Sequence, residues 1–436
     1  MNKSLVDFLK GERFTKGKYR MGYILNECSS PGTDPWLVCT FSAVPEDNSP
    51  IKHRYSFQRV LSDVPCHRLY LQDSLDEAGC YYLCAGMDFG VADTVLELIE
   101  QQRLRLGVRK EHVVTVGSSK GGTCALYFGL RGHYGHVFAM GPQTRIAEYL
   151  LRDSHSVPKS MLRFMVGAYG ESAYPVLDNV IYDILRERQG TTLHLLSSQN
   201  DNQYPVHIAP LLEQLEPDSP ENDIEIDNRI TTHSELAKFN PDYVRRKLFY
   251  LLFGVSARWE EDRVCVTAPE GNEGAVSCFF AEKPETVWQI PGQTEFPVEE
   301  DGVYTFTLVG KTESGESFVY SMPEQRISCR TERRKALLPG QGIDPGKPSE
   351  LDALLAGAEL ITEADRITIR LRMKQPGGLR FAYHLMRDGA VLEKVPYTYL
   401  AEHTFAPLEA GVYSIKFYIC TESDERKSYF VRNITI

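Results

Sequence analysis

Residues 113–122, VVTVGSSKGG, decide the fold that we predict for this chain. The four consecutive β-branched residues at 113–116 predict a strand that is buried on both faces. A Gly-Ser-Ser-Lys-Gly turn follows at once, and the next residues, TCALYFGLRG, predict a helix. Gly117 and Gly121 flank the turn, where a side chain would collide with the neighbouring strand or helix. The stretch therefore predicts a tight strand–turn–helix unit with Ser119 at its apex.

This order of strand, G-x-S-x-G turn and helix is typical of a nucleophile elbow, which lifts a serine hydroxyl above the edge of a sheet. The helix N-terminus behind the turn offers N–H groups and a positive dipole end to a developing oxyanion. Ser119 is therefore the candidate nucleophile. Glycine and serine also mark ordinary turns, so the flanking strand and helix carry the interpretation. Ser118 is expected to pack below the turn.

The composition is typical of a soluble globular protein, with 42% hydrophobic and 25% charged residues in a chain of 436. This length indicates two or three domains. A formal net charge of −11 argues against a nucleic-acid partner. No stretch approaches the roughly 20 apolar residues that span a bilayer, and the polar N-terminus does not have the pattern of a signal peptide. We therefore expect a cytoplasmic protein without a transmembrane segment.

The ten cysteines are scattered, and several lie in apolar stretches such as LVCTF and YYLCAG. They occupy positions 28, 39, 66, 80, 84, 124, 265, 278, 329 and 420. No Cys-x-x-Cys pair or Cys/His spacing typical of a metal site occurs among them. The pattern predicts reduced thiols in the core, and neither a metal nor a cofactor is expected.

Strand and helix patterns alternate up to about residue 255. Strands are predicted at YRMGYIL (19–25), WLVCTF (36–41), HRLYLQDS (67–74), HVFAMGPQ (136–143), TTLHLLSS (191–198) and DIEIDNRI (223–230). Residues 91–106 have the 3.6-residue apolar period of an amphipathic helix. Helical pieces at 144–190 are expected to form a cap or crossover. The first domain, 1–255, is therefore predicted to be α/β, with a mostly parallel sheet and helices on both faces.

From residue 256 the pattern changes to short strands broken by proline, glycine and charged turns, which predicts antiparallel β-sandwiches. We place one β-sandwich domain at 256–335, and a linker with a second sandwich at 336–436. TEFPVEEDGVYTFTLVGKTESGES, from Thr294, matches HTFAPLEAGVYSIKFYICTESDER, from His403, at a constant offset. This match predicts an internal duplication of an immunoglobulin-like domain. The two copies are expected to serve binding of protein partners, spacing or oligomer contacts, or only to stabilise the chain.

A serine hydroxyl becomes a nucleophile when a base takes its proton, and the base needs an orienting carboxylate. In α/β-hydrolases the order along the chain is serine, acid, histidine. Asp201 follows the strand predicted at 191–198, and His233 follows the strand predicted at 223–230. These two are the candidate acid and base. The alternatives are Asp218 and Asp227 for the acid and His194 and His207 for the base.

An oxyanion hole would use the backbone N–H of Lys120, the residue after the nucleophile. The second donor would come from Ser42 or Ala43, in the loop after the strand at 36–41, or from the Gly86-Met87 turn. We expect the Lys120 side chain to point toward solvent or an anionic or polar substrate, which disfavours a serine–lysine base.

The stretch GVRKEHVVTVGSSKGGTCALYFGL, with GCYYLCAG before it and Asn200, Asp201 and Tyr204 after it, resembles a bacterial subgroup of α/β-hydrolases. It is similar to the XcbB/CpsF capsule-biosynthesis proteins and, more distantly, to the accessory-secretion protein that O-acetylates glycans on serine-rich adhesins. The resemblance covers roughly residues 36–255, and GSSKGG is its most specific part. It implies Ser119 as nucleophile, Asp201 as acid and His233 as base, in a bacterial cell-surface glycan context.

These observations predict a serine-dependent acyl-ester hydrolase or acyltransferase. Its expected substrate is a small acyl ester or an acetylated bacterial surface or capsular glycan, or a precursor of one. Hydrolase and transferase share the first half-reaction, and water or a sugar hydroxyl then takes the acyl group. A serine peptidase is a variant on the same fold. The alternative from another class is a non-catalytic glycan-assembly or scaffold protein that retains the fold.

Overall fold

The computed structural model describes most of the chain. The described residues are 11–44, 55–75, 79–152, 156–216, 219–260, 262–268, 275–290, 295–298, 300–327, 333–363, 365–375 and 378–436. Asp218, Cys329 and Thr294, where the first repeat begins, lie outside these residues.

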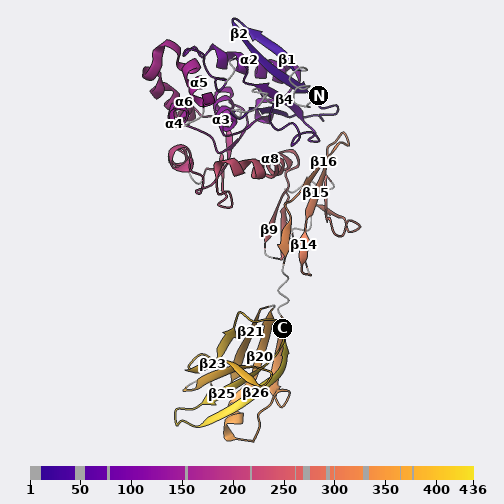
Figure 1. Ribbon diagram of the computed structural model, residues 1–436. Helices are drawn as coiled ribbons and strands as arrows, with labels where there is room; N and C mark the ends of the chain where they lie inside the picture. Colours follow the sequence, from indigo (N-terminus) through magenta and orange to yellow (C-terminus); the bar gives the residue numbers. More distant parts are fainter. Residues whose placement is uncertain are drawn as a thin grey trace. The chain divides into compact units, whose positions relative to one another are not determined.

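An eight-stranded sheet forms the centre of the N-terminal part, with the order β1-β2-β4-β3-β5-β6-β7-β8 (Figure 1). Its strands are β1 (Glu12–Lys16), β2 (Tyr19–Asn26), β3 (Leu37–Thr40), β4 (His67–Gln72), β5 (Val113–Ser118), β6 (His136–Met140), β7 (Thr192–Ser197) and β8 (Asn222–Ile226). The strands from β3 to β8 run parallel, whereas β2 pairs antiparallel with both β1 and β4. This order is that of the α/β-hydrolase fold, so the predicted mostly parallel α/β sheet is confirmed.

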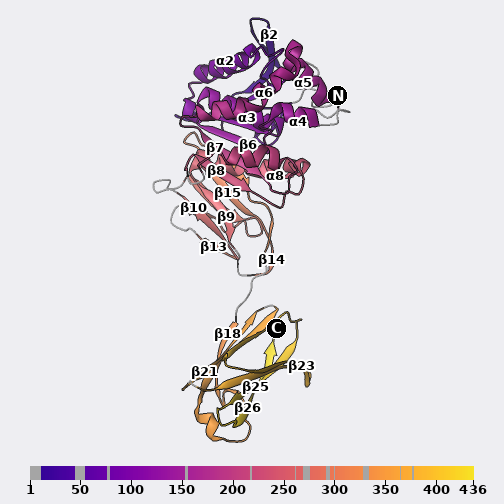
Figure 2. The ribbon, with the colours of Figure 1, turned by 90° about the vertical axis from the view of Figure 1, so that its left-hand side faces the viewer.

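Helices cover both faces of this sheet. They are α2 (Gly90–Arg105), α3 (Lys120–Gly132), α4 (Ile146–Arg152), α5 (Ser156–Val166), α6 (Tyr174–Arg186), α7 (Ala209–Leu212) and α8 (Leu236–Phe253). Buried residues of α2, α3 and α6 share one hydrophobic core, and α8 lies on the opposite face from α3 (Figure 2). Within the described residues, no helix is long and apolar enough to cross a membrane.

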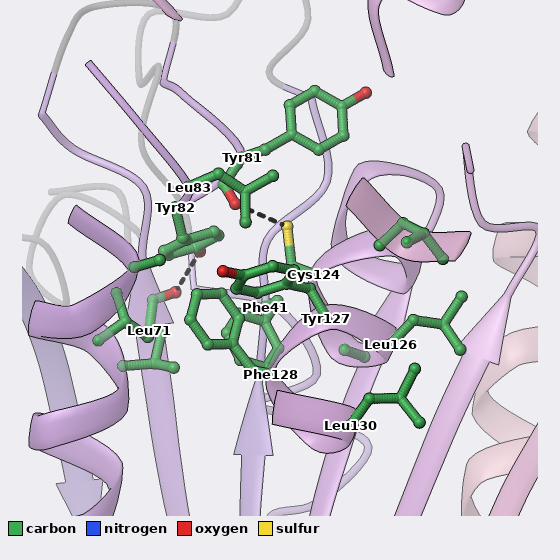
Figure 3. Packing of buried hydrophobic residues seen from close by; sticks show 14 of the residues in the cluster. Phe41, Leu71, Tyr81, Tyr82, Leu83, Cys124, Leu126, Tyr127, Phe128 and Leu130 are labelled. Atoms are coloured by element: carbon green, nitrogen blue, oxygen red, sulfur yellow. Dashed lines mark hydrogen bonds between the residues drawn. The ribbon is translucent and has the colours of Figure 1, made fainter. Parts of the chain in front are cut away.

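In the core beside α3, aromatic rings from the end of β3, from α3 and from the segment between β4 and α2 pack together (Figure 3). The Phe41 ring stacks on Phe128 of α3 with 5.1 Å between the centroids and meets the edge of Tyr82 at 5.3 Å. The Tyr82 hydroxyl donates to the Leu71 carbonyl at 3.0 Å, which satisfies a polar atom inside this apolar cluster. The nine described cysteines are free thiols. Seven of them are buried, so the prediction of core thiols is confirmed for those seven, whereas Cys28 and Cys265 are partly exposed.

The turn between β5 and α3 has no room for side chains at its two glycines. A Cβ atom on Gly117 would lie 1.9 Å from the carbonyl oxygen of Gly121, and one on Gly121 would lie 2.5 Å from the carbonyl oxygen of Phe41. Both neighbours are backbone atoms, which cannot move aside as a flexible side chain can. The glycines therefore let β5, α3 and the end of β3 approach one another closely.

Antiparallel sheets follow, as predicted. The first series is β9 (Ser256–Glu260), β10 (Arg263–Thr267), β11 (Val276–Phe280), β12 (Trp288–Ile290), β13 (Glu295–Pro297), β14 (Gly302–Tyr304), β15 (Phe306–Lys311), β16 (Ser317–Ser321) and β17 (Gln325–Ile327). Its strands form the sheets β13-β10-β9, β12-β11-β15-β16 and β14-β17.

The second series forms two larger sheets, β19-β18-β20-β21-β24 and β23-β22-β25-β26. Its strands are β18 (Arg333–Pro339), β19 (Gly342–Ile343), β20 (Leu355–Glu363), β21 (Arg366–Met373), β22 (Arg380–Arg387), β23 (Ala390–Thr398), β24 (Glu402–Phe405), β25 (Val412–Cys420) and β26 (Arg426–Thr435). Residues of both sheets share one core, in which Ile369 and Phe417 are fully buried. The Tyr413 hydroxyl donates to the Glu409 carbonyl at 2.7 Å, a contact typical of the tyrosine corner of immunoglobulin-like sandwiches.

The described chain divides into two compact units. The first comprises the described residues up to Arg258 with Cys265–Glu295 and Tyr304–Gln325, and the second comprises Trp259–Val264, Phe296–Val303 and Arg326–Ile436. The predicted domain boundaries at residues 255 and 335 remain a prediction.

The two copies of the predicted repeat contain turns with matching hydrogen bonds. In the first copy the Thr312 N–H donates to the Glu316 carbonyl at 2.8 Å, and in the second the Thr421 N–H donates to Glu425 at 3.0 Å. The Thr312 hydroxyl lies 2.8 Å from the Ser314 hydroxyl, and Thr421 and Ser423 repeat that contact at 2.8 Å. The same sequence offset thus relates two turns of the same conformation, which supports the proposed duplication.

Within the first unit, α8 connects the parallel sheet to the first antiparallel series. The Phe249 ring of α8 lies 5.5 Å from Phe318 of β16. The Arg245 guanidinium donates to the Val60 carbonyl at 3.0 Å and also to the Val319 carbonyl. Strand β16 is therefore packed on a helix of the α/β fold.

Replacing Gly117 by alanine is expected to destabilise the first unit by at least about 3 kcal/mol, because the new methyl group would overlap a backbone carbonyl. Thermal unfolding followed by circular dichroism measures this change. Gly17→Ala is the control, since Gly17 has a φ of 55° that strains an alanine, whereas a Cβ there meets nothing within 4 Å; it therefore reports backbone strain without the overlap. Equal unfolding midpoints for the two variants would contradict the proposed close approach.

Candidate active site

Ser119 occupies the turn between β5 and α3 in a conformation that residues other than glycine rarely adopt. Its φ and ψ are 56° and −123°, and backbone strain of this kind persists only where the surroundings hold it. The Ser119 N–H donates to the Met140 carbonyl of β6 at 2.8 Å, which anchors the strained residue to the neighbouring strand. The turn therefore has the geometry of a nucleophile elbow.

Ser119, His233 and Asp201 form a continuous hydrogen-bonded chain. His233 Nε2 lies 2.9 Å from Ser119 Oγ, and His233 Nδ1 lies 2.7 Å from Asp201 Oδ2. The Asp201 side chain is 2% exposed and that of His233 is 20% exposed. The three residues that the sequence singled out thus meet at one place, although 114 positions separate the serine from the histidine.

Loops at the carboxyl ends of two parallel strands supply the acid and the imidazole. Asp201 lies in the loop after β7, where its Oδ1 accepts the Gln203 N–H at 2.9 Å. His233 begins a single 3₁₀ turn after β8 that leads directly into α8. Gly141 lies against the imidazole, since a Cβ atom there would be 3.2 Å from His233 Cε1. The two ring nitrogens of His233 thus contact residues that follow different strands, Ser119 after β5 and Asp201 after β7.

The alternative acids and bases are engaged elsewhere. His194 Nδ1 lies 2.7 Å from Asp223, and Asp227 forms an ion pair with Arg229 at 2.5 Å. His207 is buried beside the site, where its Nδ1 accepts the Arg145 N–H at 3.3 Å. Burial, with a smaller effect from His233, lowers the pKa of His207 to about 4, so this imidazole is neutral near pH 7.

Gln143, just after β6, was missed by sequence reasoning. It is fully buried, and its Nε2 donates to Ser119 Oγ at 3.0 Å and to Gln203 Oε1 at 3.3 Å. Tyr81 holds the other end of the amide, with its hydroxyl 2.6 Å from Gln143 Oε1. Its place as the last, polar residue of the strand predicted at 136–143, part of which pairs with β5, was the signal available in the sequence.

The candidate oxyanion donors lie next to the turn that carries Ser119. Lys120 is the first residue of α3, a position whose N–H has no acceptor within its helix. The backbone of Ser42 lies close to the elbow, because a Cβ on Gly121 would be 3.3 Å from its carbonyl carbon. The Ser42 N–H donates to the Tyr82 hydroxyl at 3.1 Å, whereas Ala43 lines the cavity that contains Ser119.

The alternative donors in the Gly86-Met87 turn are used in another contact. The Gly86 N–H donates to the Phe164 carbonyl at 2.9 Å, and the Met87 N–H donates to the Met165 carbonyl at 2.7 Å. These bonds tie the turn to α5 and leave the loop after β3 as the better source of a second donor.

The expectation for the Lys120 side chain was wrong. It is 1% exposed and forms an ion pair with the equally buried Asp73, at 2.7 Å between Nζ and Oδ2. Its ammonium lies 5.1 Å from the centroid of the Tyr82 ring, and Asp73 also accepts the Cys80 N–H at 2.8 Å. A buried charge needs a partner of opposite charge. The elbow sequence alone does not reveal that partner, because Asp73 lies 47 residues earlier.

A cavity of about 410 Å³ opens beside Ser119 and His233. Its walls come from the end of β3, the loop before β4 and the start of α8, and they include Phe57, Val60 and Leu236. A largely apolar wall with some polar groups suits a small ligand with one reactive group. Among the described residues, no three His, Cys, Asp or Glu side chains are grouped so that they could hold a metal ion.

No family model matches the sequence, and no curated protein matches it. Similar solved structures include the capsule O-acetyltransferase of Neisseria meningitidis serogroup A, with 20% identity over 54% of this chain and 93% of that chain and a TM-score of 0.42. The glycosylation-associated Gap123 complex of Streptococcus agalactiae has 15% identity over 55% and 47%, with a TM-score of 0.47. S-formylglutathione hydrolase of Staphylococcus aureus has 12% identity over 55% and 97%, with a TM-score of 0.38. Acetyltransferases and serine hydrolases, the classes that the sequence resembles, are thus among its structural neighbours.

Lys120→Met is expected to destabilise the first unit by about 3–5 kcal/mol, because it leaves the Asp73 carboxylate buried without its partner. The thermal unfolding midpoint should recover in large part in Lys120→Met combined with Asp73→Leu. Lys16→Met removes an exposed ion pair with Glu97 and should leave the midpoint nearly unchanged. A double variant no more stable than the single one would contradict the proposed role of the pair.

Proposed function

We propose that this protein is a serine enzyme that transfers or hydrolyses an acyl group, with Ser119 as nucleophile, His233 as base and Asp201 as the orienting acid. The observation that carries the proposal is the hydrogen-bonded chain of these three side chains on a strained strand-to-helix turn. An ordinary surface serine needs neither a strained backbone nor a histidine that is held by a buried carboxylate.

In the first half-reaction, Ser119 Oγ attacks the carbonyl carbon of an ester while His233 Nε2 takes the hydroxyl proton. Asp201 accepts the Nδ1–H of His233, which fixes the tautomer and stabilises the imidazolium that forms. The tetrahedral intermediate then collapses, and Nε2 returns the proton to the departing alcohol oxygen. The product is an acyl ester on Ser119.

In the second half-reaction, water or a sugar hydroxyl attacks the acyl-enzyme while His233 again takes the proton. The new acid or ester leaves, and the proton returns to Ser119 Oγ. The same residues serve hydrolysis and transfer, and the acceptor decides between them.

The oxyanion of each tetrahedral intermediate would accept the Lys120 N–H and one N–H from the loop after β3. We assign the second donor to Ala43 rather than Ser42, since the Ser42 N–H already donates to the Tyr82 hydroxyl. Two such donors act on charge that develops only in the transition state.

For the substrate we propose an acetylated bacterial surface or capsular glycan, or a precursor of one. The apolar walls of the cavity beside Ser119 suit a small acyl group. The glycan is suggested by the resemblance of residues 36–255 to capsule-biosynthesis proteins, and the Neisseria meningitidis neighbour is itself described as a capsule O-acetyltransferase.

A fluorophosphonate probe tests the nucleophile directly. The unmodified protein should be labelled covalently, and Ser119→Ala should not be labelled, because the phosphonylated oxygen is absent. Ser118→Ala is the matched control and should keep the label. Equal labelling of Ser119→Ala and the unmodified protein would remove Ser119 from its proposed role, and no labelling of either would favour the non-catalytic scaffold.

Gln143→Leu should slow hydrolysis of p-nitrophenyl acetate by about 10- to 100-fold, because the Ser119 hydroxyl loses the donor that holds it toward His233. Tyr81→Phe removes only the anchor of the amide and should have a smaller effect. The rate constant for the acyl burst, measured with the thermal midpoint, separates positioning from folding. An unchanged burst rate in Gln143→Leu would show that this amide does not position the serine.

A further inference from the structure

A groove of about 560 Å³ lies on the sheet β23-β22-β25-β26 of the C-terminal sandwich. It is formed wholly by residues 382–428, none of which belongs to the candidate active site. Its lining includes His384, Lys394, Tyr397, Tyr418, Arg426 and Ser428. The volume is that of a site for a ligand of several rings rather than for a single inorganic ion.

Three partly exposed aromatic rings give this C-terminal groove its shape. The Tyr397 and Tyr418 centroids are 6.5 Å apart with an interplanar angle of 65°, and His384 lies 5.0 Å from Tyr418 at 63°. Because the rings are steeply inclined to one another, they form walls instead of a closed stack. Ring walls of this kind pack against the C–H faces of other rings, and the tyrosine hydroxyls remain hydrogen-bonding groups.

Cationic side chains surround the same rings. The guanidinium groups of Arg380 and Arg426 lie 5.8 and 5.5 Å from the Tyr397 centroid, and the Lys416 ammonium lies 5.0 Å from that of Tyr418. Asp424 forms ion pairs with both arginines, at 3.3 Å to Arg380 and 2.8 Å to Arg426. One carboxylate cannot neutralise two guanidinium groups, so the cluster keeps a positive charge with its arginines held in place.

The charge of the surrounding chain agrees with this local excess. Residues 333–436 contain 15 lysines and arginines against 13 aspartates and glutamates, whereas the whole chain has a net charge of −11. Partial burial lowers the pKa of His384, and Lys394 and Lys416 lower it further, which is the response of an imidazole to a positive potential.

We propose that the C-terminal groove binds an acidic oligosaccharide, with sugar rings against Tyr397 and Tyr418 and carboxylates on Arg426 and Lys394. Such a ligand combines C–H faces, hydroxyls and negative charge in one ring, which are the three features that this lining complements. A nucleic acid is the less favoured polyanion, because the protein as a whole is acidic and would repel a long phosphate backbone. This binding role does not depend on acyl transfer at Ser119.

The test measures binding of the full chain carrying Ser119→Ala, which excludes turnover, to oligogalacturonate by isothermal titration calorimetry. Dextran is the neutral control and a single-stranded DNA oligomer is the control for another polyanion. We expect binding of oligogalacturonate that weakens as salt is added, with no binding of dextran. Arg426→Gln and Lys394→Gln should each weaken it about tenfold, the effect of losing one charge-assisted hydrogen bond.

Arg372→Gln is the matched control, since Arg372 is an exposed arginine on β21 of the other sheet, and it should bind as tightly as the parent. Tyr397→Leu should also weaken binding, and at all salt concentrations. Absence of oligogalacturonate binding, equal binding by the Arg426 and Arg372 variants, or tighter binding of DNA would each overturn the proposal. None of these results depends on whether fluorophosphonate labels Ser119, so the two proposals fail separately.

Discussion

The close approach of three backbone segments at the β5–α3 turn is the constraint on which the candidate active site depends. Gly117, Gly121 and the Phe41 carbonyl lie so near one another that a single added carbon would overlap a backbone atom. This packing holds Ser119 at a positive φ. The buried pair of Lys120 and Asp73 acts at the same turn, because it fastens the first residue of α3 to the end of β4. Strain at the serine is thereby balanced by packing and by a charge pair that water does not reach.

Much of this architecture could be predicted because its causes are local in the sequence. A run of β-branched residues, two glycines at fixed spacing and a helical stretch specify the elbow without reference to the rest of the chain. The order of strand and helix patterns then places Asp201 and His233 in loops at one edge of the sheet, since parallel strands end on the same side. The change of pattern near residue 256 predicted the antiparallel sheets for the same reason, as strand length and turn residues are local features.

The parts that escaped prediction depend on contacts between distant segments. The Lys120 side chain was expected to point toward solvent or substrate from the elbow, and its partner Asp73, just after β4, lies 47 residues earlier. Gln143 and Tyr81 meet across 62 residues to orient one amide toward Ser119. No periodicity marks such pairs, because each depends on which strand ends become neighbours. In the sequence they are single residues in turns or next to strand ends.

The first antiparallel series also bears on the candidate active site. His233 leads directly into α8, and α8 packs against β16 through Phe249 and Phe318. Arg245 of the same helix contacts the Val60 carbonyl, and Val60 lines the cavity beside Ser119. The helix that follows the histidine is thus held between the parallel sheet and the antiparallel strands, and a wall of the cavity is attached to it. Loss of β16 would uncover Phe249 on α8, the helix that begins directly after the His233 turn, so this strand supports the framework of the candidate active site.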